Sequence, residues 1–262
     1  MTNVKVRKLV EAPDEEGARR LAVEMQAAGE RSLEIEVEAS KRKSVEFLES
    51  FSFLEELTVG GHAKGLDAIA NLASLRELCF LRVTVPDFGF LQGLKQLRIF
   101  DMRFGGCKAF ETLSVAKSLF GLRLMRLPSL QNLDFVSAMP KLQLLDVDSC
   151  KGIERLPDFS KNKQLRRLLL QTMNGLISLE GIESARALED LIVMEAKLLP
   201  PGEFARVRQC KSLRGVLAGV GLTTSARYRE ALACIPENLQ MDGFYATENA
   251  NFAYQGYQPF HS

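Results

Sequence analysis

Three aspartates have a spacing that could support acid–base chemistry. Asp146 and Asp148 are two residues apart, so on a β-strand both side chains lie on one face, about 6.6–7 Å apart along it. If the chain forms a parallel sheet, Asp101 lies about two strand spacings from Asp146. These separations overlap the roughly 6.5–9.5 Å between the carboxyl groups of inverting glycosidases. A carboxylate-dependent hydrolase at these positions is therefore one functional hypothesis.

Other residues weigh against catalysis. Arg103 and Arg123 fall beside the aspartates and favour their ionised form, which opposes the proton donation required of a general acid. Cys79 and His62 could form a nucleophile and base, but the repeat spacing separates them by more than about 10 Å, too far for the activating hydrogen bond. No nucleotide-binding, α/β-hydrolase or metalloprotease motif and no zinc-spaced Cys/His set occurs. We therefore expect no enzyme activity, no cofactor and no metal.

The strands that would hold these residues come from a repeated pattern, L-x-x-L-x-L, with apolar replacements at some positions. Successive copies begin 21 to 25 residues apart and all keep one register. A pattern with this period predicts one structural unit per copy, stacked on its neighbours to bury a shared core. The copies begin at Leu54, Leu75, Leu97, Leu119, Leu142, Leu165, Leu188 and Leu213.

Over about residues 31–234 this pattern resembles the leucine-rich-repeat proteins, and the apolar residues between the strands resemble the short-repeat, internalin-like class. The resemblance implies an α/β fold: a horseshoe-shaped solenoid with a parallel concave sheet and short helices or 3₁₀ turns on the convex side. Only Cys150 matches the Asn or Cys that the family places three residues after the last strand leucine. We therefore expect some turns to be irregular.

The repeats divide the chain into three parts. Residues 1–30 are predicted to form an N-terminal cap, with a strand followed by a helix that begins near Pro13 and ends at Gly29. Residues 31–235 form the solenoid, closed by a helix over 227–235. Its first repeat is degenerate, and we expect Ile35 and Val37 to point inward there.

Residues 236–262 form a tail in which aromatic residues are interleaved with mostly uncharged ones. In one interpretation the tail docks partly on the C-terminal cap and is otherwise mobile. In the other it is a recognition segment that inserts into a partner, another copy of the chain, or the chain's own concave face. Insertion into another copy would make the protein a self-assembling scaffold. The recognition residues would be Phe244, Tyr245, Phe252 and Tyr254.

Strand alternation predicts two columns of side chains on the concave sheet, because the leucines point into the core. The first column is Glu36, Thr58, Cys79, Asp101, Arg123, Asp146, Leu169, Ile192 and Leu217. The second is Glu38, Gly60, Leu81, Arg103, Met125, Asp148, Gln171, Met194 and Gly219. The columns predict an acidic N-terminal zone, a middle zone of mixed charge, and an apolar C-terminal zone that exposes Leu144, Leu169, Ile192, Met194 and Leu217.

The charged middle zone is either a solvated cross-strand ion ladder, worth a few tenths of a kcal/mol per pair, or part of an interface. The apolar zone indicates an interaction site, unless the aromatic tail covers it. The leading hypothesis is a partner protein bound on the concave face. The residues assigned to it are Asp101, Arg103, Arg123, Met125, Asp146, Asp148, Leu169, Gln171, Ile192 and Met194.

Composition limits the kind of partner and the compartment. The 34 Lys and Arg residues nearly balance the 33 Asp and Glu residues, so we expect neither nucleic acid nor a membrane surface as partner. The N-terminus lacks an apolar signal region, and five unclustered cysteines fit reduced thiols, so we expect a cytoplasmic protein. A monomer is favoured over an oligomer. The resemblance implies an adaptor, an inhibitor or a bacterial immunity protein.

Overall fold

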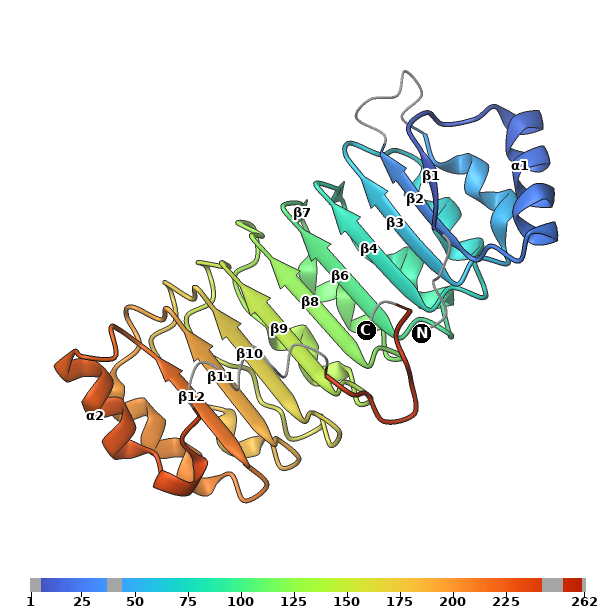
Figure 1. Cartoon of the computed structure of the whole chain (residues 1–262). Coiled ribbons are helices and arrows are strands. Elements are labelled where there is room, and N and C mark those ends of the chain that lie inside the picture. The colour runs from blue at the N-terminus through green and yellow to red at the C-terminus, as the bar shows by residue number, and fades with distance from the viewer. Residues whose placement is uncertain (1–5, 37–43, 242–251, 261–262) are drawn as a thin grey trace. The chain divides into compact units, whose positions relative to one another are not determined.

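The computed structural model describes residues 6–36, 44–241 and 252–260. The chain forms two compact units. The N-terminal unit comprises residues 1–119 and 256–262, and the C-terminal unit comprises residues 120–255. Each unit contains parallel strands, and in the view of Figure 1 its short helices lie behind them.

The N-terminal unit has parallel strands paired in chain order. They are β1 (Val6–Leu9), β2 (Ser32–Glu36), β3 (Glu56–Gly60), β4 (Glu77–Leu81) and β6 (Ile99–Arg103). Two short strands, β5 (Thr84–Val85) and β7 (Gly106–Cys107), pair with each other. The helical segments are α1 (Glu15–Ala27) and the 3₁₀ helices η1 (Glu46–Phe51), η2 (Leu66–Asn71), η3 (Gly89–Gly93) and η4 (Phe110–Val115).

The C-terminal unit repeats this arrangement. Its strands, also parallel and in chain order, are β8 (Gly121–Met125), β9 (Leu144–Asp148), β10 (Arg167–Gln171), β11 (Asp190–Met194) and β12 (Gly215–Gly219). Its 3₁₀ helices are η5 (Asp134–Ala138), η6 (Ile182–Ser184), η7 (Pro201–Gln209) and η8 (Glu237–Leu239). Helix α2 (Ala226–Cys234) follows β12 and corresponds to the predicted closing helix.

The core has the predicted origin. The second and fourth residues of each five-residue strand point inward, as do most of the apolar residues between strands, and the leucines that define the repeat are buried. The cap helix α1 begins where the Asp14 side chain accepts a hydrogen bond from the Gly17 N–H, at 2.9 Å. It ends just before Gly29, whose φ of +69° is readily adopted by glycine. The helix predicted from Pro13 to Gly29 is therefore confirmed.

The first repeat has a different register from the one predicted. Leu33 and Ile35 are the inward pair, since they align with Leu57 and Val59 on the paired strand. Val37 lies outside the described residues. The outward positions of this strand are therefore taken by Glu34 and Glu36, and the assignment of Glu36 and Glu38 to the two columns was wrong by two residues.

The turns after β4, β6, β8, β9, β10 and β11 share one regular conformation despite the missing side-chain ladder, whereas the turn after β12 differs. The residue following each of several strands adopts a left-handed conformation with φ between 50° and 60°. In this conformation its N–H reaches the next strand: Thr172 donates to the Met194 carbonyl at 2.8 Å, and Ser149 donates to the Gln171 carbonyl at 2.9 Å. Backbone bonds therefore replace the side-chain ladder that the sequence lacks. The left-handed residues are Arg82, Phe104, Arg126, Ser149, Thr172 and Glu195.

Replacing Thr172 by glycine is expected to raise the free energy of unfolding by about 0.5–1 kcal/mol. A β-branched residue at φ 50° is strained, and relief of about 1–2 kcal/mol exceeds the added chain entropy of glycine. Urea unfolding of both proteins measures the difference. The control, Thr172→Ala, keeps the Cβ atom and should not stabilise. A less stable glycine variant would show that strain does not dominate at this turn.

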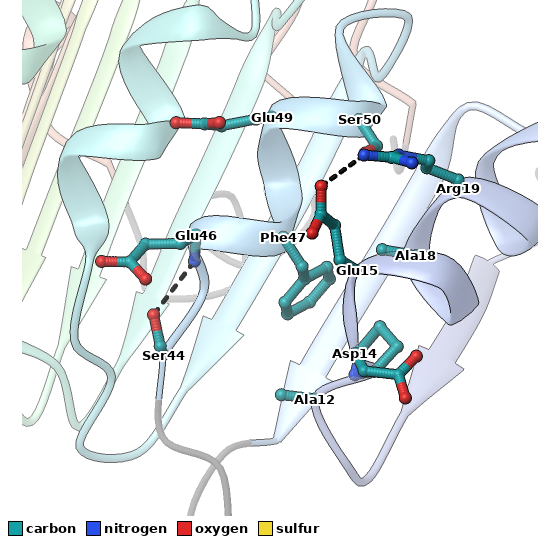
Figure 2. A pocket seen from close by; sticks show the side chains of 11 residues that line it. Ala12, Asp14, Glu15, Ala18, Arg19, Ser44, Glu46, Phe47, Glu49 and Ser50 are labelled. Carbon is teal, nitrogen blue, oxygen red and sulfur yellow. Dashed lines mark hydrogen bonds and ion pairs between the residues drawn. The ribbon is translucent and has the colours of Figure 1, made fainter.

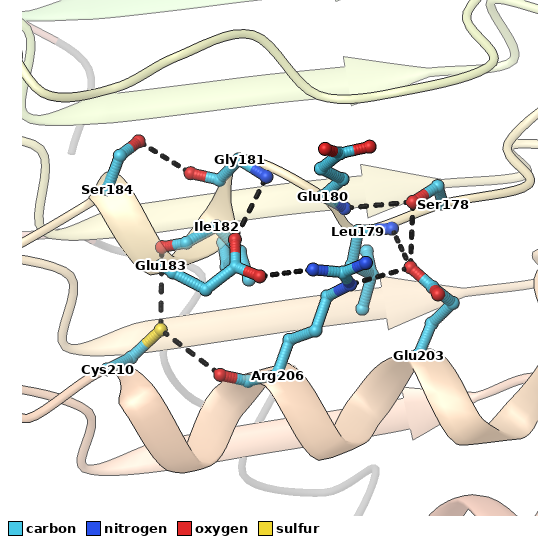
Figure 3. A network of polar contacts seen from close by, with 10 residues as sticks. All are labelled: Ser178, Leu179, Glu180, Gly181, Ile182, Glu183, Ser184, Glu203, Arg206 and Cys210. Carbon is cyan, nitrogen blue, oxygen red and sulfur yellow. Dashed lines mark hydrogen bonds and ion pairs between the residues drawn. The ribbon is translucent and has the colours of Figure 1, made fainter.

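A polar network joins two repeats of the C-terminal unit on the side away from the strand face (Figure 3). Arg206 forms ion pairs with both Glu183 and Glu203, the latter at 3.0 Å. Glu203 also accepts hydrogen bonds from the Ser178 hydroxyl and the Leu179 N–H, each at 2.8 Å. Burial raises the pKa of both glutamates, but hydrogen bonds outweigh it and leave each pKa below its usual value. For Glu203 they come from Ser178, Leu179 and Arg206, and for Glu183 from backbone N–H groups and Arg206.

This network predicts an acid-sensitive contribution to stability. Because the folded-state pKa values of Glu183 and Glu203 are lowered, their contribution is present above the unfolded glutamate pKa of about 4.3 and is lost as the pH falls through the folded values. Replacing Arg206 by methionine removes the shared cation. We expect urea unfolding between pH 7 and pH 3 to show a smaller loss of stability in Arg206→Met than in the wild type. Equal losses would contradict this assignment.

Candidate functional site

The strand face opposite the core presents three columns, formed by the first, third and fifth residues of each strand. The third and fifth columns are the two that were predicted from the sequence, whereas the first column was not predicted. Extending the same alternation one step towards the N-terminus finds it. In the N-terminal unit the first column is Ser32, Glu56, Glu77 and Ile99; in the C-terminal unit it is Gly121, Leu144, Arg167, Asp190 and Gly215.

Acidic side chains of the N-terminal unit are held by neighbours. Arg82 donates to Glu36 at 3.0 Å. Asp101 is buried and forms an ion pair with Arg103 on its own strand, with a Nε to Oδ1 distance of 2.9 Å. Burial, together with the charge of Asp101, raises the pKa of the Cys79 thiol to about 12. Cys79 is therefore a poor nucleophile at neutral pH.

The other two aspartates of the hydrolase hypothesis are also engaged. The Gln171 amide donates to Asp146 at 3.1 Å, and the Ser149 hydroxyl donates to Asp148 at 2.7 Å. In these contacts both carboxylates act as hydrogen-bond acceptors. The geometry thus supplies a polar surface at these positions.

Arg123 does not form the predicted ion ladder. It is the register partner of Asp146 on the adjacent strand, but the two side chains form no ion pair. Within the described ranges, the Arg123 side chain makes no hydrogen bond or ion pair, although its backbone belongs to the paired strand β8. Its half-buried guanidinium therefore presents donors on the strand face of the C-terminal unit.

The apolar zone is less exposed than predicted. Leu169 and Met194 are half-buried, whereas Ile192 is only 1% exposed and Leu144 and Leu217 are also buried. Ile192 lies in register between Leu169 and Leu217 on the two paired strands, so side chains flank it on both sides. The partly exposed residues of the third and fifth columns of this unit are Arg123, Met125, Asp146, Asp148, Leu169, Gln171, Met194 and Gly219.

Tail residues 252–255 dock on the first column of the C-terminal unit. Tyr254 is buried, and its ring lies where a side chain at Gly121 would otherwise project. The Phe252 ring lies 5.2 Å from the Arg166 guanidinium carbon. These residues contact the strand face, whereas Gln240, nearer the start of the tail, docks on the C-terminal cap by donating to the Leu232 and Ile235 carbonyls. Phe244 and Tyr245 lie outside the described residues.

Tail residues beyond 255 belong to the N-terminal unit. The Tyr257 hydroxyl donates to Glu77 at 2.6 Å, and the Phe260 N–H donates to the same carboxylate oxygen at 2.9 Å. Burial and the hydrogen bond with Glu77 raise the pKa of Tyr257 above its usual value, so the phenol stays protonated. Glu77, a first-column residue, is therefore the attachment point of the tail in this unit.

A separate cavity of about 700 Å³ lies between α1 and η1 (Figure 2). Its charged lining includes Asp14, Glu15, Glu46 and Glu49, with Arg19 paired to Glu15. Among the described residues no group of three or more His, Cys, Asp or Glu side chains has the arrangement of a metal site. In the same part of the chain, none of the helices has the length and apolarity needed to span a bilayer.

Comparison with known proteins identifies the fold. No protein-family model matches the sequence, and no curated protein matches it either. Internalin C2 from Listeria monocytogenes is similar in structure, with a TM-score of 0.53 and 20% identity over 69% of this chain and 74% of the other. The leucine-rich-repeat domain of the type III effector XCV3220 (XopL) has a TM-score of 0.53 and 19% identity over 92% of this chain and 77% of the other. The chain therefore has the leucine-rich-repeat solenoid fold in its short-repeat, internalin-like form.

Proposed function

We propose that the strand face of the C-terminal unit binds another protein without catalysis. Met125, Leu169 and Met194 offer partly exposed apolar area, and polar side chains surround it. A surface with partly exposed apolar side chains at its centre and Arg and amide groups beside them has the composition of a protein interface. The proposal thus rests on the third and fifth columns, which carry most of the residues assigned from the sequence.

Arg123 is the observation that carries this proposal. An arginine side chain that is half-buried and has no partner among the residues that the structure describes retains five donors in a planar fork. Such a group pairs best with a carboxylate in two parallel hydrogen bonds. We therefore infer that the partner places an Asp or Glu side chain against Arg123.

We place this binding in the cytoplasm, where adaptors and inhibitors act without turnover. All five cysteines are free thiols, which supports a reducing compartment. Burial raises the pKa of Cys150 and Cys210 to about 11, so these thiols are unreactive core residues and not redox sites.

Charge reversal at Arg123 tests the proposal. Affinity capture from the native cytosol, followed by titration calorimetry with the purified partner, compares wild type, Arg123→Glu and Arg155→Glu. Arg155 is the matched control, since it is exposed and lies outside the strands. We expect Arg123→Glu to weaken binding at least about tenfold, as at interface hot spots, and Arg155→Glu to leave it unchanged. Equal affinity of all three proteins would overturn the proposal.

A further inference from the structure

Residues 252–255 contact the C-terminal unit through their backbone as well as their side chains. The Gln143 side chain is almost fully buried, and its amide nitrogen donates to the Gln255 carbonyl at 2.9 Å. Its amide oxygen accepts from the Gln255 N–H at 2.8 Å. One side chain thus provides the donor and acceptor that a neighbouring strand would provide. Contacts of this kind recognise the extended form of a segment.

Arg166 holds a second backbone group of the segment. It donates to the Ala253 carbonyl at 3.1 Å. Two further bonds of 3.0 and 3.1 Å connect Arg166 to Glu189, so its guanidinium is fixed in orientation. The positive charge of Arg166 is therefore paired with Glu189 inside the protein. A remaining N–H group of Arg166 is available to bond the neutral carbonyl of the segment.

Side chains add selectivity for aromatic residues. A Cβ atom at Gly121 would meet the Tyr254 ring and hydroxyl, so glycine at this position makes room for the tyrosine. The Phe252 ring lies 5.2 Å from Arg166 and 5.9 Å from Arg167, within the range of cation–π attraction. The Phe252 and Tyr254 rings meet edge to face with centroids 5.0 Å apart.

We propose that Gly121, Gln143, Arg166 and Arg167, named the tail site, form a binding site for an extended peptide of the type aromatic-x-Tyr-x, whose last residue is held through its backbone alone. The chain's own Phe252–Gln255 segment is its resident ligand. Ala253 and Gln255 are exposed and the segment is held without a covalent bond, so a partner protein that carries such a sequence can displace it. Gly121 and Arg167 of the tail site belong to the first column, and Gln143 and Arg166 directly precede it, so the site is independent of the interface proposed around Arg123.

A labelled peptide tests the tail site in the full-length protein. The probe is the hexapeptide Phe-Ala-Tyr-Gln-Gly-Tyr, copied from residues 252–257, with fluorescence anisotropy as the readout. The resident segment competes at a millimolar effective concentration in the wild type. We expect the double variant Phe252→Ala/Tyr254→Ala, which loses both anchors, to bind the probe at least tenfold more tightly.

Two changes within the site itself are the decisive controls. In the double-variant background, Gly121→Leu fills the position of the tyrosine and Gln143→Met removes both backbone bonds; each should weaken probe binding at least tenfold. A probe with Ala in place of its first tyrosine, the counterpart of Tyr254, should also bind weakly. Circular dichroism melting checks that each variant is folded.

Three results would overturn the tail site: no probe binding to the folded double variant, equal binding to wild type and double variant, or binding unaffected by both Gly121→Leu and Gln143→Met. Light scattering measures the mass of the protein in solution and so shows whether the resident segment belongs to the same chain or to a second copy. A monomeric wild type supports occupancy by the chain's own tail. A dimer that dissociates in the double variant would overturn that occupancy and assign the segment to a second copy.

Discussion

Replacing Phe88 by alanine is expected to lower the free energy of unfolding by about 4 kcal/mol. Phe88 is fully buried in the N-terminal unit. Its ring lies 5.7 Å from that of Phe100 and 5.8 Å from that of Phe110, centroid to centroid. Truncation removes the apolar burial and leaves a cavity among rigid aromatic neighbours that belong to separate repeats, and such changes cost about 3–5 kcal/mol.

Urea unfolding monitored by circular dichroism measures the Phe88 effect, with Leu222→Ala as the control. Leu222 is 78% exposed, so its truncation should change stability by less than about 0.5 kcal/mol. Because each repeat packs only on its neighbours, the Phe88 change should destabilise the N-terminal unit first. A loss for Phe88→Ala no larger than that of the control would contradict the packing described for this cluster.

Local repetition explains why most of the fold could be predicted. The spacing of the leucines sets the strands, and the same period sets which side chains share a column. The error in the first repeat arose where the pattern is incomplete: Leu33 and Ile35 match Leu57 and Val59, but the copy lacks the earlier leucine that marks the register elsewhere. The regularity of most turns was not predicted, for another reason. In the family pattern, side chains bond the backbone groups of the turn, whereas here a left-handed backbone conformation lets those groups bond the next strand.

Contacts between distant parts of the chain could not be predicted in this way. Gly121 and Tyr254 are far apart in sequence, and no periodicity relates them. The glycine at the first position of β8 indicates a contact with Tyr254 only once the tail is known to pass over it. Gly215 on β12 is similar, since a Cβ atom there would meet Met241. The position of a residue in a strand predicts the face to which its side chain points. Whether that side chain is buried depends on which other residues cover it.

Ile192 and Leu169 show the difference between direction and burial most directly. They are register partners on adjacent strands and point to the same face, yet Ile192 is 1% exposed and Leu169 is half-buried. Replacing Ile192 by aspartate is expected to lower the free energy of unfolding by more than about 4 kcal/mol, because the charge has no buried partner. Leu169→Asp, whose carboxylate can reach water, should cost about 1–2 kcal/mol.

Thermal melts of the two single variants measure this contrast, and equal melting temperatures would contradict it. The contrast also decides which variant can test recognition. A binding loss in Ile192→Asp would report unfolding of the C-terminal unit. A loss in folded Leu169→Asp would report a contact with the partner. Leu169→Asp combined with Arg123→Glu should therefore abolish binding without abolishing the fold, because both side chains reach the surface of the same strand face.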